Sequence, residues 1–168
     1  MTSNARILGS LRSAGGKGIV HIEDRFGTGI EDLWQALTDP ERLARWYGDV
    51  EGDLRPGGEY RVRVHASGWD GTGRIEACEP PRRLVVTGKD PDEPFEEVTE
   101  VTLTADGGQT LLVIEQQGLP LDQLAAYGAG LQLHVEDLTA HLAGRGRAGQ
   151  ARWGELMPAY KDLASGLG

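Results

Sequence analysis

Apolar residues between positions 30 and 46 recur with the period of a helix. The first four occur at i, i+3, i+4 and i+7, namely Ile30, Leu33, Trp34 and Leu37. This spacing places them on one face of a short amphipathic helix, which needs a partner to pack against. Leu43 and Trp46 continue the pattern in a second short helix, and we interpret both tryptophans as core residues rather than ligand contacts.

Polar signals divide this stretch into two helices. Thr28 stands three residues before Glu31, a spacing that predicts a capping box at the start of the first helix. Asp39 and Pro40 predict a second start, because Asp caps free amides and Pro fits the first helical position. Gly48 is expected to end the second helix.

The hydrophobic period changes to two after the turn at residues 56–58. Tyr60, Val62 and Val64 alternate with arginines, as expected for a strand with one buried face. Strands are expected over residues 5–11, 18–26, 60–65, 71–78, 83–89, 96–104 and 110–117. Consecutive strands at this spacing usually pair with their neighbours, so the pattern predicts an antiparallel meander.

A helical period returns after residue 120. One stripe contains Leu124, Tyr127, Leu131, Val135, Leu138 and Leu142, which predicts a long helix that ends near Gly144. Gly128 and Gly130 each cost about 1 kcal/mol relative to Ala inside it. They mark either a break or a close approach to the sheet, and we favour the approach. A last apolar stripe, Trp153, Leu156, Met157, Tyr160 and Leu163, predicts a short or kinked terminal helix because Pro158 interrupts it.

Composition limits the classes of function. The chain has 168 residues, the usual size of one domain, and 26 acidic against 17 basic residues give a net charge of −9. Negative charge disfavours nucleic acid and anionic membrane surfaces. The N-terminus lacks the apolar core of a secretory signal, and no apolar run reaches the roughly 20 residues of a membrane helix. We therefore expect a cytoplasmic protein that binds neither nucleic acid nor membrane.

Few residues suggest chemistry. Cys78 is the one cysteine, which rules out a disulfide framework, and we interpret it as a structural thiol. His134, Asp137 and His141 share one side of the long helix, but no ligand from another element is evident, so no metal is predicted. A solvated shoulder with an Asp137–His141 pair is expected there. Nucleophile elbows and phosphate loops are absent, so neither catalytic residues nor a cofactor are predicted.

Several of these segments together resemble a known family. They are Leu33–Trp34, Leu37–Pro40, Leu43, Trp46, Asp53–Gly58, Gly73–Pro81 and Arg83–Leu84, with Gly118–Pro120, Gly130–His134 and Leu138 further on. The set is similar to the AHSA1-type branch of the START-like superfamily, named for the activator of the Hsp90 ATPase, and it spans roughly residues 18–144. Members commonly carry Trp where this chain has Leu131, a change that enlarges a pocket or removes its aromatic lid.

The resemblance implies an α+β helix-grip fold. A curved antiparallel sheet of six to seven strands would wrap around the long C-terminal helix, with two short helices after the first strand. Residues 1–168 would form one domain: an N-terminal extension with room for an extra strand (1–17), the family core (18–144) and a helical tail (148–165).

The family fold also implies a ligand cavity between sheet and helix. Alternation places an apolar set inward, namely Tyr60, Val62, Val64, Ile75, Val101, Leu103, Leu112 and Ile114, opposite Leu131, Val135 and Leu138. Candidate polar ligand contacts are Trp69, Glu97, Thr99 and Gln116, for which exposure at the rim or a local hydrogen bond is the alternative. An apolar pocket with a few polar groups is typical of small-molecule sites.

Three functions remain open. The first is binding of an apolar or amphipathic small molecule. The second is a polyketide cyclase or aromatase, which needs two facing ionisable groups such as Glu97 and Tyr60. The third is a protein-interaction module like the Hsp90 activators, although residues 1–17 are too few for the additional N-terminal domain of those proteins. The glycines of the long helix, or the tail, could equally serve a homodimer contact.

Overall fold

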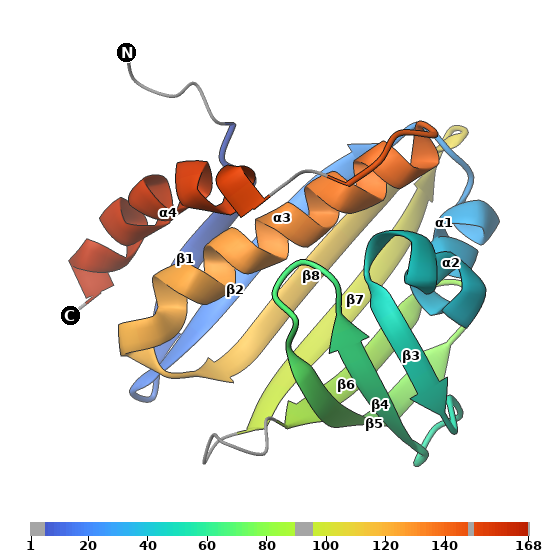
Figure 1. The fold of residues 1–168 in the computed structure, drawn as a ribbon, viewed down its shortest axis with the longest axis horizontal. Coiled ribbons are helices and arrows are strands. Elements are labelled where there is room, and N and C mark those ends of the chain that lie inside the picture. Colours follow the sequence, from blue (N-terminus) through green and yellow to red (C-terminus); the bar gives the residue numbers. More distant parts are fainter. Residues whose placement is uncertain (1–5, 90–95, 148–149, 168) are drawn as a thin grey trace.

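The computed structural model describes residues 6–89, 96–147 and 150–167, and one curved antiparallel sheet dominates it (Figure 1). The strands are β1 (Gly9–Ala14), β2 (Lys17–Phe26), β3 (Gly48–Gly52), β4 (Glu59–Val64), β5 (Asp70–Glu79), β6 (Arg83–Lys89), β7 (Glu96–Asp106) and β8 (Gln109–Leu119). Their spatial order is β1-β2-β8-β7-β6-β5-β4-β3. The predicted meander is confirmed, and the sheet has eight strands rather than six or seven.

Two strands differ from the sequence prediction. β3 was not predicted, because its sequence Gly-Asp-Val-Glu-Gly has a single apolar residue and therefore no alternation. β1 begins at Gly9 rather than at Ala5, which lies outside the described residues, and it pairs with β2 through a tight turn at Gly15 and Gly16. Both glycines have positive φ, which explains why the hairpin turns there.

Two short helices, α1 (Ile30–Thr38) and α2 (Pro40–Trp46), follow β2 as predicted. The predicted N-cap of α2 is confirmed, since the Asp39 side chain accepts a hydrogen bond from the Glu41 amide at 3.1 Å. The predicted capping box is wrong: Gly29 is the N-cap of α1, and the Thr28 hydroxyl donates to Asp32 instead. Gly48 does not end α2 but begins β3.

The long helix α3 (Leu124–Leu142) lies across the concave side of the sheet, after the short 3₁₀ helix η1 (Leu121–Gln123). Its Leu131, Val135 and Leu138 are buried in the main hydrophobic cluster. Sheet residues of that cluster include Val20, Ile22, Val101, Leu103, Leu112 and Ile114, and α1 and α2 add both predicted core tryptophans, Trp34 and Trp46. The two short helices therefore close one end of the core.

The terminal helix α4 (Gln150–Ala164) contains Pro158 within its length and leads into the 3₁₀ helix η2 (Ser165–Leu167). α4 packs on α3 and β1 (Figure 1). A Cβ atom at Gly128 would lie 2.5 Å from the ring of Tyr160 and 3.2 Å from Leu11. The close approach at Gly128 is therefore to α4 first and also to β1 of the sheet, whereas Gly130 has nothing near its Cβ position.

A buried polar network fixes α4 to the rest of the chain. The Gln132 side-chain oxygen accepts from the Tyr160 hydroxyl at 2.6 Å and from the Leu8 amide at 3.0 Å. The Tyr160 oxygen in turn accepts from the Gly9 amide at 3.1 Å. Gln132 and Tyr160 are both fully buried, so the bond between them joins α3 and α4 where water does not compete, and the partly buried bonds from the Leu8 and Gly9 amides attach the N-terminal segment.

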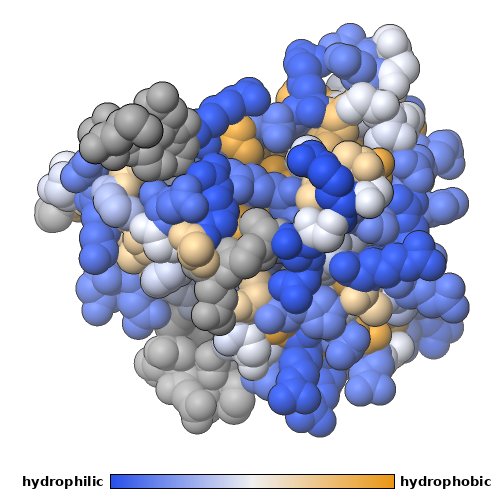
Figure 2. Space-filling model, turned by 45° about the horizontal axis from the view of Figure 1, so that its top comes forward, coloured by the Kyte–Doolittle hydropathy of each residue, from blue (hydrophilic) through white to orange (hydrophobic). Residues whose placement is uncertain are grey.

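The face shown in Figure 2 is mostly hydrophilic, and apolar residues appear on it only in small separate patches. Within the described ranges, no helix has the length and apolar character needed to cross a membrane.

Candidate functional site

The helix α3 approaches the two halves of the sheet differently. It packs closely on β1, β2 and α2, whereas no comparable approach to β4, β5, β6 or β7 occurs among the described residues. In Figure 1, β3 to β6 lie to one side of α3, and Ala66 in the turn between β4 and β5 packs against the cluster that includes Ala129 and Leu133 of α3. Long polar and aromatic side chains lie on the inward face of this half of the sheet, and they form the candidate site.

Two of these side chains converge along one row of the sheet. Tyr60 of β4 is paired with Gly73 of β5, Gly73 with Gly88 of β6, and Gly88 with Glu97 of β7. A Cβ atom at Gly73 would lie 2.8 Å from Tyr60 Cε1, and one at Gly88 would lie 3.0 Å from Glu97 Oε1. Tyr60 and Glu97 thus each lean over the neighbouring strand toward the other. Gly73 and Gly88 lie between them, and because these residues have no side chain they leave space for the phenol and the carboxylate.

Trp69 provides a second aromatic ring beside Tyr60. It precedes β5, and its ring lies against Gly71, where a Cβ atom would collide with it. Gly71 and Gly73 are two residues apart on one strand and both are buried, so they share the inward face. The rings of Trp69 and Tyr60 therefore cover adjacent parts of β5.

Tyr47 and His134 complete the cluster from the side of the helices. Tyr47 follows α2, and its ring meets the edge of the His134 imidazole at a centroid distance of 5.0 Å and an interplanar angle of 76°. His134 Nδ1 is buried and makes no hydrogen bond within the described part of the chain. Sequence reasoning missed Tyr47 and placed His134 on a solvated shoulder, because their burial depends on how α2 and α3 meet.

The titratable groups in the cluster are strongly affected by burial. Desolvation raises the pKa of Tyr60 to about 12, and the nearby charge of Glu97 acts in the same direction. The pKa of Tyr47 is raised further, again by burial first and then by Tyr60 and Glu97. Burial lowers the pKa of His134 to about 4, with a smaller contribution from Arg147. At neutral pH both phenols are therefore protonated and the imidazole is uncharged.

Thr99 and Gln116 lie next to each other on β7 and β8 and also face inward. The Gln116 amide donates to the Thr99 hydroxyl at 3.3 Å. For these two residues, the structure shows the local hydrogen bond that was the alternative to a ligand contact.

The predicted apolar lining divides into two groups. Most of it belongs to the main cluster, as described above for α3, β7 and β8. Val62, Val64 and Ile75 are also buried, each with at most 6% of its surface accessible, but they lie outside that cluster.

The signal that could have located the site is the pair Gly73 and Gly88, because glycine inside a strand often marks a close approach.

The shoulder predicted around Asp137 is wrong. Asp137 is 1% exposed, because α2 and α4 pack on α3 in addition to the sheet. His141 Nε2 accepts from Arg42 Nε at 3.3 Å, and burial lowers the pKa of His141. No group of three or more metal-binding side chains occurs in the described ranges.

Cys78 is half-buried, and burial raises the pKa of its thiol, which does not favour a nucleophile.

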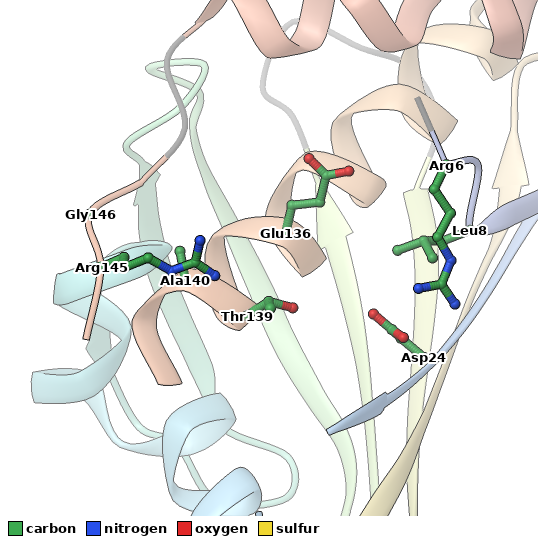
Figure 3. A pocket seen from close by; sticks show the side chains of 8 residues that line it. All are labelled: Arg6, Leu8, Asp24, Glu136, Thr139, Ala140, Arg145 and Gly146. Atoms are coloured by element: carbon green, nitrogen blue, oxygen red, sulfur yellow. The ribbon is translucent and has the colours of Figure 1, made fainter. Parts of the chain in front are cut away.

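A separate, open pocket of about 450 Å³ lies on the other side of α3 (Figure 3). Its lining is Arg6, Leu8, Asp24, Glu136, Thr139, Ala140, Arg145 and Gly146. Glu136 is already bound by Arg152 at 2.6 and 2.8 Å. This pocket is shallow and of mixed charge, and none of its residues was predicted from the sequence.

The curved sheet, the two short helices and the long C-terminal helix across it define a helix-grip protein of the START-like kind. More specifically, the chain belongs to the family of Activator of Hsp90 ATPase homolog 1-like proteins (AHSA1), whose model matches residues 28–143. No curated protein matches the sequence.

Solved structures show the same fold. CalU16 from Micromonospora echinospora is 26% identical, over 93% of this chain and 95% of that chain, with a TM-score of 0.76. DynU16, a protein of the dynemicin biosynthetic locus, is 25% identical over 77% of this chain and 49% of its own, with a TM-score of 0.71. EF2215 from Enterococcus faecalis, of unknown function, matches over 95% of this chain and 92% of that chain at 15% identity and a TM-score of 0.78, which shows the fold alone.

Proposed function

We propose that the protein binds an apolar or amphipathic small molecule between α3 and the half of the sheet formed by β4 to β7. The observation that carries this proposal is the state of Tyr47 and His134. Their rings pack edge to face and His134 Nδ1 is buried, and yet both residues retain accessible surface. A side chain that is deep in the protein and still accessible borders an interior space.

The surroundings support this interpretation. Protein interiors are normally close-packed, so side chains on facing elements should touch. Val62, Val64 and Ile75 are buried without joining the main cluster, and α3 diverges from the strands that carry them. A ligand in this space would meet an apolar wall and a few polar groups, as in most small-molecule sites.

The relatives support a small-molecule ligand as well. DynU16 is assigned to a biosynthetic locus, where a protein that holds a small molecule has an evident use. CalU16 is similar over nearly the whole of both chains, so the comparison includes the site.

A filling substitution tests the proposal. Ile75→Trp places an indole in the proposed space, and Thr72→Trp places one on the exposed face of the same strand. We expect the wild type and Thr72→Trp to bind a fluorescent apolar probe such as an anilinonaphthalene sulfonate, and Ile75→Trp to lose that binding while it stays folded. If no space exists, Ile75→Trp overpacks the interior and costs about 1–3 kcal/mol of stability. Probe binding unaffected by Ile75→Trp would contradict the proposal.

A polyketide cyclase or aromatase is the second candidate, favoured by the convergence of Tyr60 and Glu97. A carboxylate that accepts a proton and a phenol that donates one are what such a reaction needs. Glu97→Gln would then abolish turnover of a poly-β-ketone thioester without abolishing its binding. Equal turnover by Glu97→Gln and the wild type would exclude this role.

A further inference from the structure

Two tyrosine hydroxyls of the candidate site make no hydrogen bond within the described part of the chain. They belong to Tyr47 and Tyr60, which are both half-buried, and neither oxygen is fully enclosed by the described residues. Tyr160 shows the contrast, because its buried hydroxyl donates to Gln132 and accepts from the Gly9 amide. The hydroxyls of Tyr47 and Tyr60 are therefore left available to a bound molecule.

The two phenols lie at opposite ends of one apolar strip. Tyr60 is near the start of β4, and Val62 and Val64 follow it on the same inward face. Tyr47 lies beyond the other end of the strip, since its carbonyl accepts from the amide of His65, the residue after Val64, at 2.9 Å. A ligand that lies along the two valines would meet a phenol at each end.

Both hydroxyls are hydrogen-bond donors at neutral pH. Burial raises the pKa of Tyr60 to about 12 and raises that of Tyr47 further, so neither phenol ionises. Tyr60 contributes to the shift of Tyr47, which indicates that the two side chains lean toward each other. The ring of Tyr47 is held by the edge contact with His134, whose imidazole is itself uncharged because burial and Arg147 both oppose its protonation.

Unpaired donors of this kind discriminate between ligands. A molecule that enters the space displaces water from the hydroxyls, and it loses affinity if it cannot replace the hydrogen bonds that the water made. One donor left unpaired in the interior corresponds to a loss of about tenfold in affinity. A charged head would exchange its hydration for neutral donors, which is unfavourable as well.

We propose that this site selects amphipathic ligands with neutral acceptor oxygens, such as ketone carbonyls, which accept hydrogen bonds from the hydroxyls of Tyr60 and Tyr47. The apolar part of the ligand would lie along Val62, Val64 and Ile75. This inference rests on the proposed function, because it requires the interior space, and it adds the chemical class of the ligand.

Four probes with one ring system and different heads test the inference. Naphthalene, acetonaphthone, naphthoate and naphthylmethylammonium have no head, a neutral acceptor, an anion and a cation, and equilibrium dialysis measures the binding of each. We expect acetonaphthone to bind about tenfold more tightly than naphthalene and more tightly than either ion. If all four bind equally, or an ion binds best, the preference is refuted and the interior site stands. If none binds, the interior site itself is refuted, together with the preference.

Hydroxyl deletions identify the residues responsible. The double variant Tyr47→Phe/Tyr60→Phe should bind acetonaphthone about tenfold more weakly than the wild type and bind naphthalene equally well. Tyr160→Phe is the matched control, because it removes the same atom outside the site, and it should change neither affinity. In the infrared spectrum, the carbonyl stretch of bound acetonaphthone should lie lower in the wild type than in the double variant, since a hydrogen bond weakens the C=O bond. Unchanged affinity and an unchanged carbonyl stretch in the double variant would overturn the assignment.

Thermal unfolding without ligand provides an independent check. Tyr47→Phe and Tyr60→Phe each remove a hydroxyl that has no described protein partner, so neither should lower Tm, whereas Tyr160→Phe should. A decrease in Tm for Tyr47→Phe or Tyr60→Phe as large as that for Tyr160→Phe would show that the hydroxyl is already bonded within the protein, and it would overturn the proposal.

Discussion

Removal of one hydroxyl, in Tyr160→Phe, tests how α4 is fixed to the fold. The hydroxyl donates to Gln132 at 2.6 Å and accepts from the Gly9 amide at 3.1 Å. The first bond is fully buried and contributes about 1 kcal/mol net, and an amide left without its acceptor costs about 1–3 kcal/mol. We therefore expect the free energy of unfolding to fall by about 2–4 kcal/mol.

Calorimetry and urea unfolding measure this change. For a chain of this length, 1 kcal/mol corresponds to about 2–4 °C in Tm, so Tyr160→Phe should lower Tm by about 4–16 °C. A double-mutant cycle with Gln132→Leu provides the control, because two residues in one network should show non-additive effects. A Tm change below about 1 °C, or full additivity, would refute the view that this network holds α4 in place.

Three further predictions concern the site and the histidines. Gly73→Ala should lower stability by about 1–3 kcal/mol in urea unfolding and weaken probe binding, because its Cβ would displace the ring of Tyr60; unchanged binding would contradict the leaning position of Tyr60. In an NMR titration the imidazole of His134 should stay neutral down to about pH 5, and protonation near pH 6.5 would show that it is solvated. The hydrogen bond to Glu115, and next the one to Glu23, raises the pKa of His21, so its stabilisation is present below the unfolded value of 6.5 and lost as pH rises through the folded value. His21→Gln should therefore reduce the free energy of unfolding more at pH 5.5 than at pH 9, and an equal loss at both would contradict this pairing.

Periodicity was sufficient to predict the elements that bury one continuous face. The two short helices, the long helix and most of the meander are stabilised by apolar residues at regular intervals, and those intervals are visible in the sequence. β3 could not be found this way, because its one apolar side chain, Val50, is only half-buried and the strand exists through pairing with β4. The capping box failed for a local reason: Thr28 has a second acceptor, Asp32, one turn further on.

The candidate site was only partly predictable. Alternation places Tyr60 and Glu97 on the inward face, but sequence alone does not show that they lean toward each other over Gly73 and Gly88, since this depends on the register of four strands. His134 was misplaced because a helical wheel assumes one buried face, whereas α3 is covered by α2 and α4 as well as by the sheet.

The two glycines under Tyr60 and Glu97 have a consequence for how ligand size can change. A side chain at Gly73 or Gly88 would lift the neighbouring polar group off the sheet and push it into the interior. The depth of the proposed site can therefore be altered at two glycines of the sheet, while Tyr60 and Glu97 keep their identity. Under the proposed function, relatives that bind molecules of different size are expected to differ at these two positions before they differ in the lining itself.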